Sequence, residues 1–176
     1  MQTQPRPRND GDHCFVCGPT NGSGLQVQFR LDGDVCRGEF TPSEDHCGFD
    51  GITHGGILFA LLDDVMANWL FLKGIRAYTA KCDVRFRNPL PTGSRVLLEG
   101  RWVKQKQNVV VMEGTALRAD TAAPVASCQA RFVMERWLAA VRGRKRRVFG
   151  VALRRTGGAR NTLFCRSAEL AADPCV

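Results

Sequence analysis

An aspartate stands in the middle of an apolar stretch, where a charged side chain needs a chemical or structural reason. On a helix, the neighbours of Asp63 at three and four residues' distance are all apolar. They are Phe59, Ala60, Met66 and Ala67. A carboxylate on such a face is costly to desolvate unless a partner stabilises it. The position therefore indicates either a functional carboxylate or one that is satisfied by a structural hydrogen bond or ion pair.

Two glycines, Gly55 and Gly56, follow His54 at the expected start of the same helix. They let a ligand approach the backbone, and the first N–H groups of a helix have no internal acceptor. Such N–H groups suit a carbonyl oxygen that becomes an oxyanion, although the same residues also make a tight entry from loop to helix. Gly55 and Asp63 are eight residues apart, or about 12 Å along a helix. We therefore expect two antiparallel helices of a dimer to share one site.

The hydrophobic pattern predicts the helix and the strands that hold these residues. Residues 55–74 are apolar almost all round, which is typical of a helix buried on most sides. Alternating patterns predict strands over 25–31, 35–41, 78–86, 95–103, 109–118 and 126–135, with residues 42–53 as a loop. Short connections favour an antiparallel sheet. The prediction is an α+β fold in which a curved antiparallel sheet wraps around one long central helix.

Three segments together identify a family resemblance. The first runs from His13-Cys14-Phe15-Val16-Cys17-Gly18 to Leu25, the second is residues 51–64, and the third is residues 79–93 with its Asn88-Pro89 break. Within residues 13–136 the sequence resembles hotdog-fold acyl-CoA thioesterases of the PaaI-like group. The resemblance implies hydrolysis of acyl-CoA thioesters without a cofactor or metal, by a homodimer or homotetramer.

The resemblance also implies residue roles. Asp63 would be the general base or the nucleophile, and the Gly55 N–H would polarise the thioester carbonyl. His54 would shape the site or touch substrate, and Thr79 would help to orient water. Many relatives have an asparagine where this chain has Gly48, which leaves a supporting contact without its usual residue.

Substrate binding is assigned to Gly56 and to two basic residues, Arg85 and Arg87. Strand alternation predicts that Arg85 and Arg87 share one face with Lys81 and Thr79, where they could meet the phosphates of CoA. They could equally be solvated surface charges.

Cys14 and Cys17 form a CxxC pair, preceded by His13. A structural zinc site needs four ligands, commonly two such pairs, and the sequence holds no second pair. The pattern therefore favours a turn that packs Phe15 and Val16 over a metal site. Asp64, four residues before Asn68, is expected to be an ordinary solvated carboxylate near a polar edge.

Charge is distributed unevenly along the 176 residues, whose formal net charge is +8. Residues 137–176 hold nine Lys and Arg against two acids, whereas residues 1–136 hold sixteen against fifteen. We expect a flexible segment over 1–12, a catalytic domain over 13–136 and a basic, disordered tail over 137–176. The tail lacks aromatic residues interleaved with its basic cluster at 142–147, so a nucleic-acid partner is not favoured.

Neither a leader peptide nor an apolar run of about 20 residues is visible, which predicts a cytoplasmic protein without a membrane partner. The main alternative function is a hotdog protein that binds acyl-CoA or another small ligand without catalysis. A hotdog dehydratase is a second alternative, but His54 before a glycine pair fits thioester cleavage better.

Overall fold

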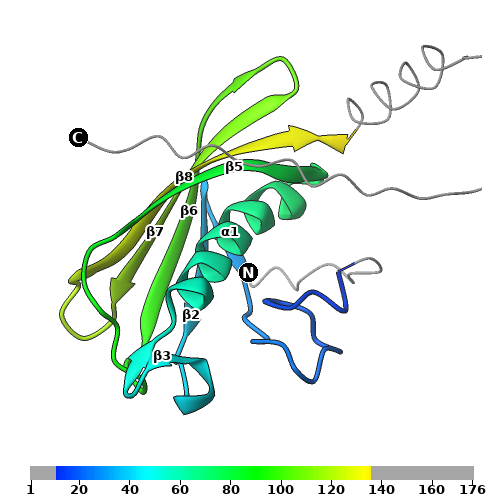
Figure 1. The fold of residues 1–176 in the computed structure, drawn as a ribbon. Coiled ribbons are helices and arrows are strands. Elements are labelled where there is room, and N and C mark those ends of the chain that lie inside the picture. The colour runs from blue at the N-terminus through cyan, green and yellow to red at the C-terminus, as the bar shows by residue number, and fades with distance from the viewer. Residues whose placement is uncertain (1–10, 136–176) are drawn as a thin grey trace, which may run out of the picture.

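The computed structural model describes residues 11–135, so the predicted basic tail and the first ten residues lie outside the described part of the chain. An antiparallel sheet curves around a single long helix (Figure 1). The elements are β1 (Arg30–Asp32), β2 (Val35–Phe40), the 3-10 turn η1 (Glu44–His46), β3 (Cys47–Phe49), β4 (Ile52–Thr53), α1 (Gly55–Leu72), β5 (Ala77–Phe86), β6 (Val96–Lys106), β7 (Val109–Arg118) and β8 (Pro124–Met134).

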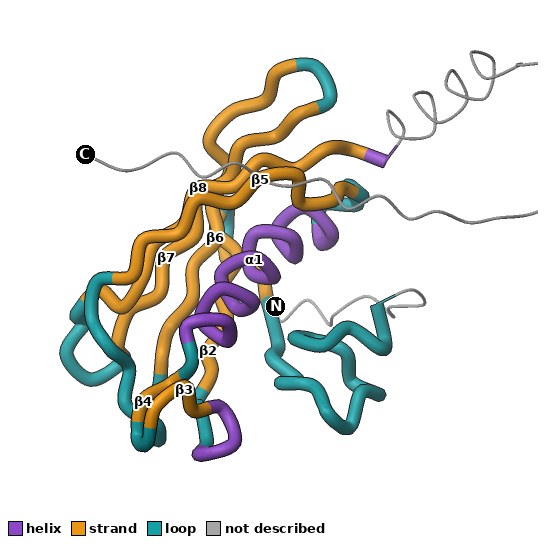
Figure 2. Tube along the Cα trace, in the orientation of Figure 1, coloured by secondary structure: helices purple, strands orange, loops and turns teal. Residues whose placement is uncertain are grey.

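The six strands of the main sheet lie in the order β1-β2-β6-β7-β8-β5, and every neighbouring pair is antiparallel. Strand β5 follows α1 in the chain and forms one edge of the sheet. Helix α1 lies across the concave face, with the short hairpin β3–β4 at its N-terminal end (Figure 2). The predicted fold class is therefore confirmed.

The core lies between α1 and the sheet. Leu61, Leu62 and Val65 have no exposed surface. Gly100 on β6 lets the sheet approach the helix backbone, because a Cβ there would lie 2.7 Å from the carbonyl oxygen of Val65. This close approach fixes the height of α1 over the sheet, and so the depth at which its polar side chains lie.

Helix α1 has the length and composition of a membrane-spanning helix, and it is the one such candidate within residues 11–135. The core helix of a folded domain has the same composition. Here eight of its side chains are buried inside the domain, against the sheet and the N-terminal segment. Packing inside the domain thus accounts for its apolar character.

One predicted strand is mostly absent. Residues 25–29 are not strand, because Gln26 has a φ of +51° and interrupts the extended backbone. The neighbouring N–H groups bond elsewhere: Leu25 donates to the carbonyl of Phe15, and Val27 donates to that of Val16. The alternating apolar residues are still used, because Val27 is buried. The predicted loop over 42–53 contains η1, β3 and β4.

Candidate active site

A hydrogen bond between α1 and the edge strand β5 defines the candidate site. The Thr79 hydroxyl donates to Oδ1 of Asp63 at 2.7 Å. Asp63 lies midway along α1 and is half-buried, whereas Thr79 is exposed on the described chain. The two residues predicted to activate water are thus in direct contact, and the carboxylate keeps a second oxygen for another partner.

A β-bulge places the Thr79 side chain on the helix side of the sheet. Thr79 is opposite Phe132 on β8, whereas Lys81 is opposite the next residue, Arg131, so Ala80 is the extra residue. Successive residues on a strand face opposite sides, and Phe132 is fully buried. Thr79 therefore lies on the core face and Lys81 on the outer face.

The bulge corrects the predicted alternation along β5. Arg85 shares the outer face with Lys81 and Asp83, not with Thr79. Arg85 and Arg87 line a shallow outer-face cavity of about 240 Å³ together with Asp83. Their assignment to substrate binding stays a prediction, but it no longer follows from a face shared with Thr79.

Burial raises the pKa of the Asp63 carboxyl, and the negative charge of neighbouring Asp64 raises it further. The hydrogen bond from Thr79 acts in the opposite direction and lowers the pKa, because it stabilises the ionised form. The net pKa of Asp63 lies above the ordinary value for aspartate. A raised pKa makes this carboxylate a stronger proton acceptor than a solvated one.

His54 caps the N-terminus of α1. It is the N-cap residue of α1, and its Nδ1 accepts a hydrogen bond of 2.8 Å from the Gly56 N–H. A Cβ at position 56 would lie only 2.8 Å from Nδ1. Gly56 is therefore required for the cap, and its N–H is used by the cap and not by a ligand in this conformation.

The N–H of the neighbouring Gly55, unlike that of Gly56, is not used by the cap. Within residues 11–135 it donates to no acceptor, as is usual for the first turn of a helix. The ring of Phe86 lies beside it, 3.5 Å from where a Cβ at Gly55 would stand. Gly55 is thus the better candidate of the two glycines for an oxyanion donor.

Gly48, which replaces the usual asparagine, packs directly against His54. A Cβ at position 48 would lie 3.1 Å from both Cα and Cδ2 of His54. In addition, the His54 N–H donates to the carbonyl of His46 at 2.7 Å. Close backbone packing therefore supports the His54 cap in place of a side chain at position 48.

A neighbouring face of α1, about 100° around the helix from Asp63, carries a polar cluster that the sequence did not predict. Asp64 is half-buried, and Asn68 donates to its Oδ2 at 2.8 Å. The Cys14 thiol lies 3.6 Å from the other carboxylate oxygen of Asp64. The prediction of a solvated Asp64 is therefore wrong, because the N-terminal segment folds over it. The predicted turn is partly confirmed: Val16 is buried, but Phe15 is 49% exposed.

Known proteins resemble this chain in the segment that carries the candidate site. Residues 50–125, which include α1, β5 and the residues of the candidate site, match the thioesterase superfamily. Over this segment, which is less than half of the chain, the protein is similar to the thioesterase superfamily. Its helix wrapped in an antiparallel sheet is the hotdog fold of those proteins, which confirms the resemblance seen in the sequence.

Individual proteins show the same similarity in sequence or in fold. The mouse (Mus musculus) acyl-coenzyme A thioesterase THEM5 is 30% identical over 46% of this chain and 33% of its own length. The crystal structure of a thioesterase superfamily protein is 27% identical, with a TM-score of 0.65 over 69% of this chain and 60% of that one. The E. coli PaaI protein has the same fold at 19% identity, with a TM-score of 0.58 over 62% of this chain and 83% of its own. The chain spans between 24% and 33% of the length of the curated relatives that it matches.

Proposed function

We propose that the protein hydrolyses acyl-CoA thioesters to a free acid and CoA. The observation that carries the proposal is the half-buried Asp63 carboxylate with the Thr79 hydroxyl bonded to one of its oxygens. The superfamily match and the name of the mouse relative, an acyl-coenzyme A thioesterase, support a thioester as substrate.

Asp63 and Thr79 have complementary roles in this mechanism. The hydroxyl donates its one proton to Oδ1, so Oδ2 of Asp63 can accept a proton from a water molecule. That water attacks the thioester carbonyl carbon while its proton passes to the carboxylate. Collapse of the tetrahedral intermediate expels the CoA thiolate, which takes up the proton held by Asp63 and so restores the carboxylate. Direct attack by Asp63 to form an anhydride is the competing route.

The oxyanion donor in this proposal is the Gly55 N–H of a second subunit. Eight helical residues separate Gly55 from Asp63, which is about 12 Å and too far for both to act on one carbonyl. A two-fold axis beside α1 would pair each Asp63 with the other subunit's Gly55 and create two equal sites.

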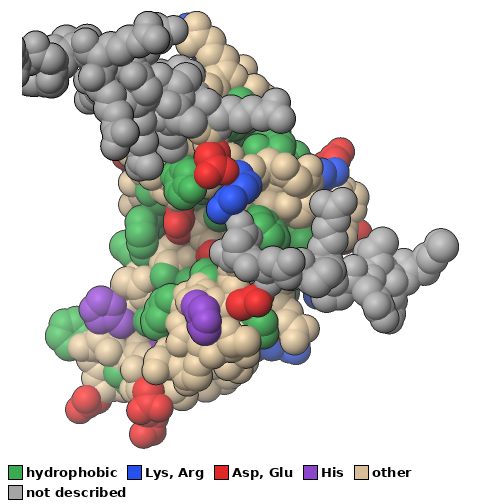
Figure 3. Space-filling view, turned by 90° about the vertical axis from the view of Figure 1, so that its right-hand side faces the viewer, with side chains coloured by type: hydrophobic (Ala, Val, Ile, Leu, Met, Phe, Trp, Pro, Cys, Tyr) green, Lys and Arg blue, Asp and Glu red, His purple; other side chains and the backbone are tan. Residues whose placement is uncertain are grey.

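The edge strand β5 supports such an assembly. It has one neighbour in the sheet, β8, and most of its residues are exposed. Tyr78 and Phe86 on this strand are 51% and 53% exposed, and Phe59 on α1 is 40% exposed. Figure 3 shows hydrophobic side chains at the surface on the side of the sheet where α1 lies. Exposed edges and apolar side chains are the surfaces that proteins cover by association.

A panel of acyl-CoA substrates tests the proposal, with loss of the thioester as the readout. Asp63→Asn should abolish turnover. Asp83→Asn is the matched control, because Asp83 lies on the outer face of β5, paired with Lys81. The outcome that contradicts catalysis is tight binding of acyl-CoA by the wild-type protein without hydrolysis, as expected for a binding protein of the same fold.

A further inference from the structure

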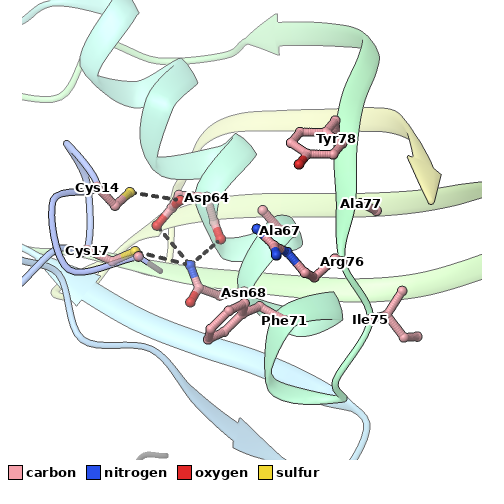
Figure 4. A pocket seen from close by; sticks show the side chains of 11 residues that line it. Cys14, Cys17, Asp64, Ala67, Asn68, Phe71, Ile75, Arg76, Ala77 and Tyr78 are labelled. Carbon is pink, nitrogen blue, oxygen red and sulfur yellow. Dashed lines mark hydrogen bonds between the residues drawn. The ribbon is translucent and has the colours of Figure 1, made fainter. Parts of the chain in front are cut away.

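Three potential metal ligands meet where the N-terminal segment crosses α1. The thiols of Cys14 and Cys17 and a carboxylate oxygen of Asp64 all lie within 4.8 Å of one another. Figure 4 shows both cysteine side chains directed from the N-terminal segment toward Asp64 and Asn68 of the helix. We propose that Cys14, Cys17 and Asp64 bind a zinc ion that fastens this segment to α1.

The spacing of one ligand pair, the thiol of Cys14 and the carboxylate of Asp64, suits a tetrahedral ion. Zinc bonds are about 2.3 Å to thiolate sulfur and about 2.0–2.2 Å to carboxylate oxygen, which sets sulfur and oxygen about 3.5 Å apart. The Sγ of Cys14 lies 3.6 Å from Oδ1 of Asp64. Only a small adjustment of side chains is therefore needed for an ion to bind between them.

A buried amide supports the ligands from behind. Asn68 is 3% exposed, and its Nδ2 donates to Oδ2 of Asp64 at 2.8 Å. The same Nδ2 lies 3.5 Å from the Sγ of Cys17. Donors of this kind commonly orient metal ligands and stabilise their ionised forms. Asn68 thus contacts one ligand of each type, a thiol and a carboxylate.

The backbone of the N-terminal segment holds the two cysteines in place. The Gly18 N–H donates to the carbonyl of Cys14 at 3.0 Å, and the Cys14 N–H donates to that of Gly11 at 3.0 Å. A Cβ at position 18 would lie 2.4 Å from the Cys14 nitrogen, so the turn requires glycine. This tight turn directs both thiols toward one point, with little further ordering needed when the ion binds.

The ligand chemistry favours zinc over hard cations. Two thiolates select zinc and similar soft ions over magnesium or calcium, which prefer oxygen. Both thiols lose their protons to solvent when the ion binds, so three anionic groups surround a divalent ion. The fourth position is left for a water molecule or an outside ligand. It faces a cavity of about 180 Å³ whose wall also includes Arg76 and Tyr78.

Sequence reasoning disfavoured this site because it required a second ligand pair. Asp64 is 50 residues from Cys14 in the chain, and nothing in the local pattern connects them. The fold supplies the third ligand and leaves one position open, which is a coordination that zinc also adopts in proteins.

The test measures metal content of the full-length protein, which does not depend on its activity. The protein is purified under reducing conditions, exchanged with a chelator, reloaded with zinc alone and analysed by elemental mass spectrometry. Wild type should bind about one zinc per chain, as expected for one such site. Cys14→Ser, Cys17→Ser and Asp64→Asn should each lose most of it, whereas Cys47→Ser and Asp63→Asn, the matched controls, should retain it.

Cobalt substitution separates loss of a ligand from loss of the fold. Wild type loaded with cobalt should show the thiolate charge-transfer absorption of a tetrahedral site, and each cysteine variant should weaken it. In wild type, zinc should also protect Cys14 and Cys17, but not Cys47, from alkylation. The proposal is overturned if reduced wild type takes up no zinc, or if the three ligand variants bind zinc as wild type does. The cluster would then be a set of hydrogen bonds between the N-terminal segment and α1.

Discussion

Two adjacent carboxylates on α1 have entirely different surroundings. Asp63 faces β5, the edge strand of the sheet, where the hydroxyl of Thr79 contacts it. Asp64 is rotated by about 100° around the helix and faces the N-terminal segment. The Cys14 thiol of that segment and the buried amide of Asn68, one turn further along α1, contact it. The same residue type thus suits proton transfer on one side of the helix and metal binding on the other, because each neighbouring element supplies different partners.

The largest expected effect is the loss of turnover on substitution of Asp63, which should leave the zinc site at Asp64 intact. Asp63→Asn keeps the shape of the side chain but cannot accept a proton, so we expect turnover to fall by about 10²–10⁴-fold. The same variant should retain zinc, because Asp63 lies on the other side of the helix. Steady-state kinetics and metal analysis on one sample would check both statements. Unimpaired hydrolysis by Asp63→Asn would remove the proposed role of this carboxylate.

A smaller effect is expected at Thr79, the partner of Asp63. Thr79→Val removes the hydroxyl at similar volume and should lower kcat/KM by about tenfold to a hundredfold, the worth of a hydrogen bond to a charged group. Thr79→Ser, which keeps the hydroxyl, should retain most of the activity. Equal activities of the valine and serine variants, measured with the best acyl-CoA, would show that the contact only supports the structure.

The smallest expected effect concerns Gly48. Gly48→Asn introduces the residue that the family resemblance leads us to expect at this position, but its Cβ would crowd His54 at 3.1 Å. We expect a loss in the free energy of unfolding of about 1 kcal/mol, the lower range for an overpacked site. Denaturant unfolding would measure it, with Gly22→Asn as control, since nothing lies within 4 Å of a Cβ there. An asparagine variant more stable than wild type would show that the cap tolerates a larger neighbour.

Patterns within a short stretch of sequence predicted the features that depend on neighbouring residues alone. The apolar stretch gave the position of α1, whose observed range is Gly55–Leu72, and the desolvation argument singled out Asp63. The bulge at Ala80 has no comparable signal, because it depends on how β5 pairs with β8. It reversed the expected side of Thr79 relative to Arg85.

Contacts between segments far apart in the chain could not be predicted from the sequence either. The contact between Cys14 and Asp64 joins segments 50 residues apart, and only the folded chain brings them together. Gln26, with its positive φ, shows the same limit on a smaller scale, since alternation of apolar residues predicted burial correctly but not strand geometry.

In the proposed active site, Asp63 of one subunit acts with Gly55 of the other. Gly55→Pro removes the N–H at the first helical position, where proline is well tolerated, and His54 already has the extended backbone that precedes proline. Neither Gly55→Pro nor Asp63→Asn alone should hydrolyse acyl-CoA at more than a small fraction of the wild-type rate.

The decisive measurement is the activity of the two variants after they are unfolded and refolded together. Each mixed dimer would contain one intact site, with Asp63 from the proline variant and Gly55 from the asparagine variant. Random pairing in equal amounts should therefore restore about a quarter of the wild-type activity. No recovery, in a mixture shown to contain mixed dimers, would contradict a site shared between subunits.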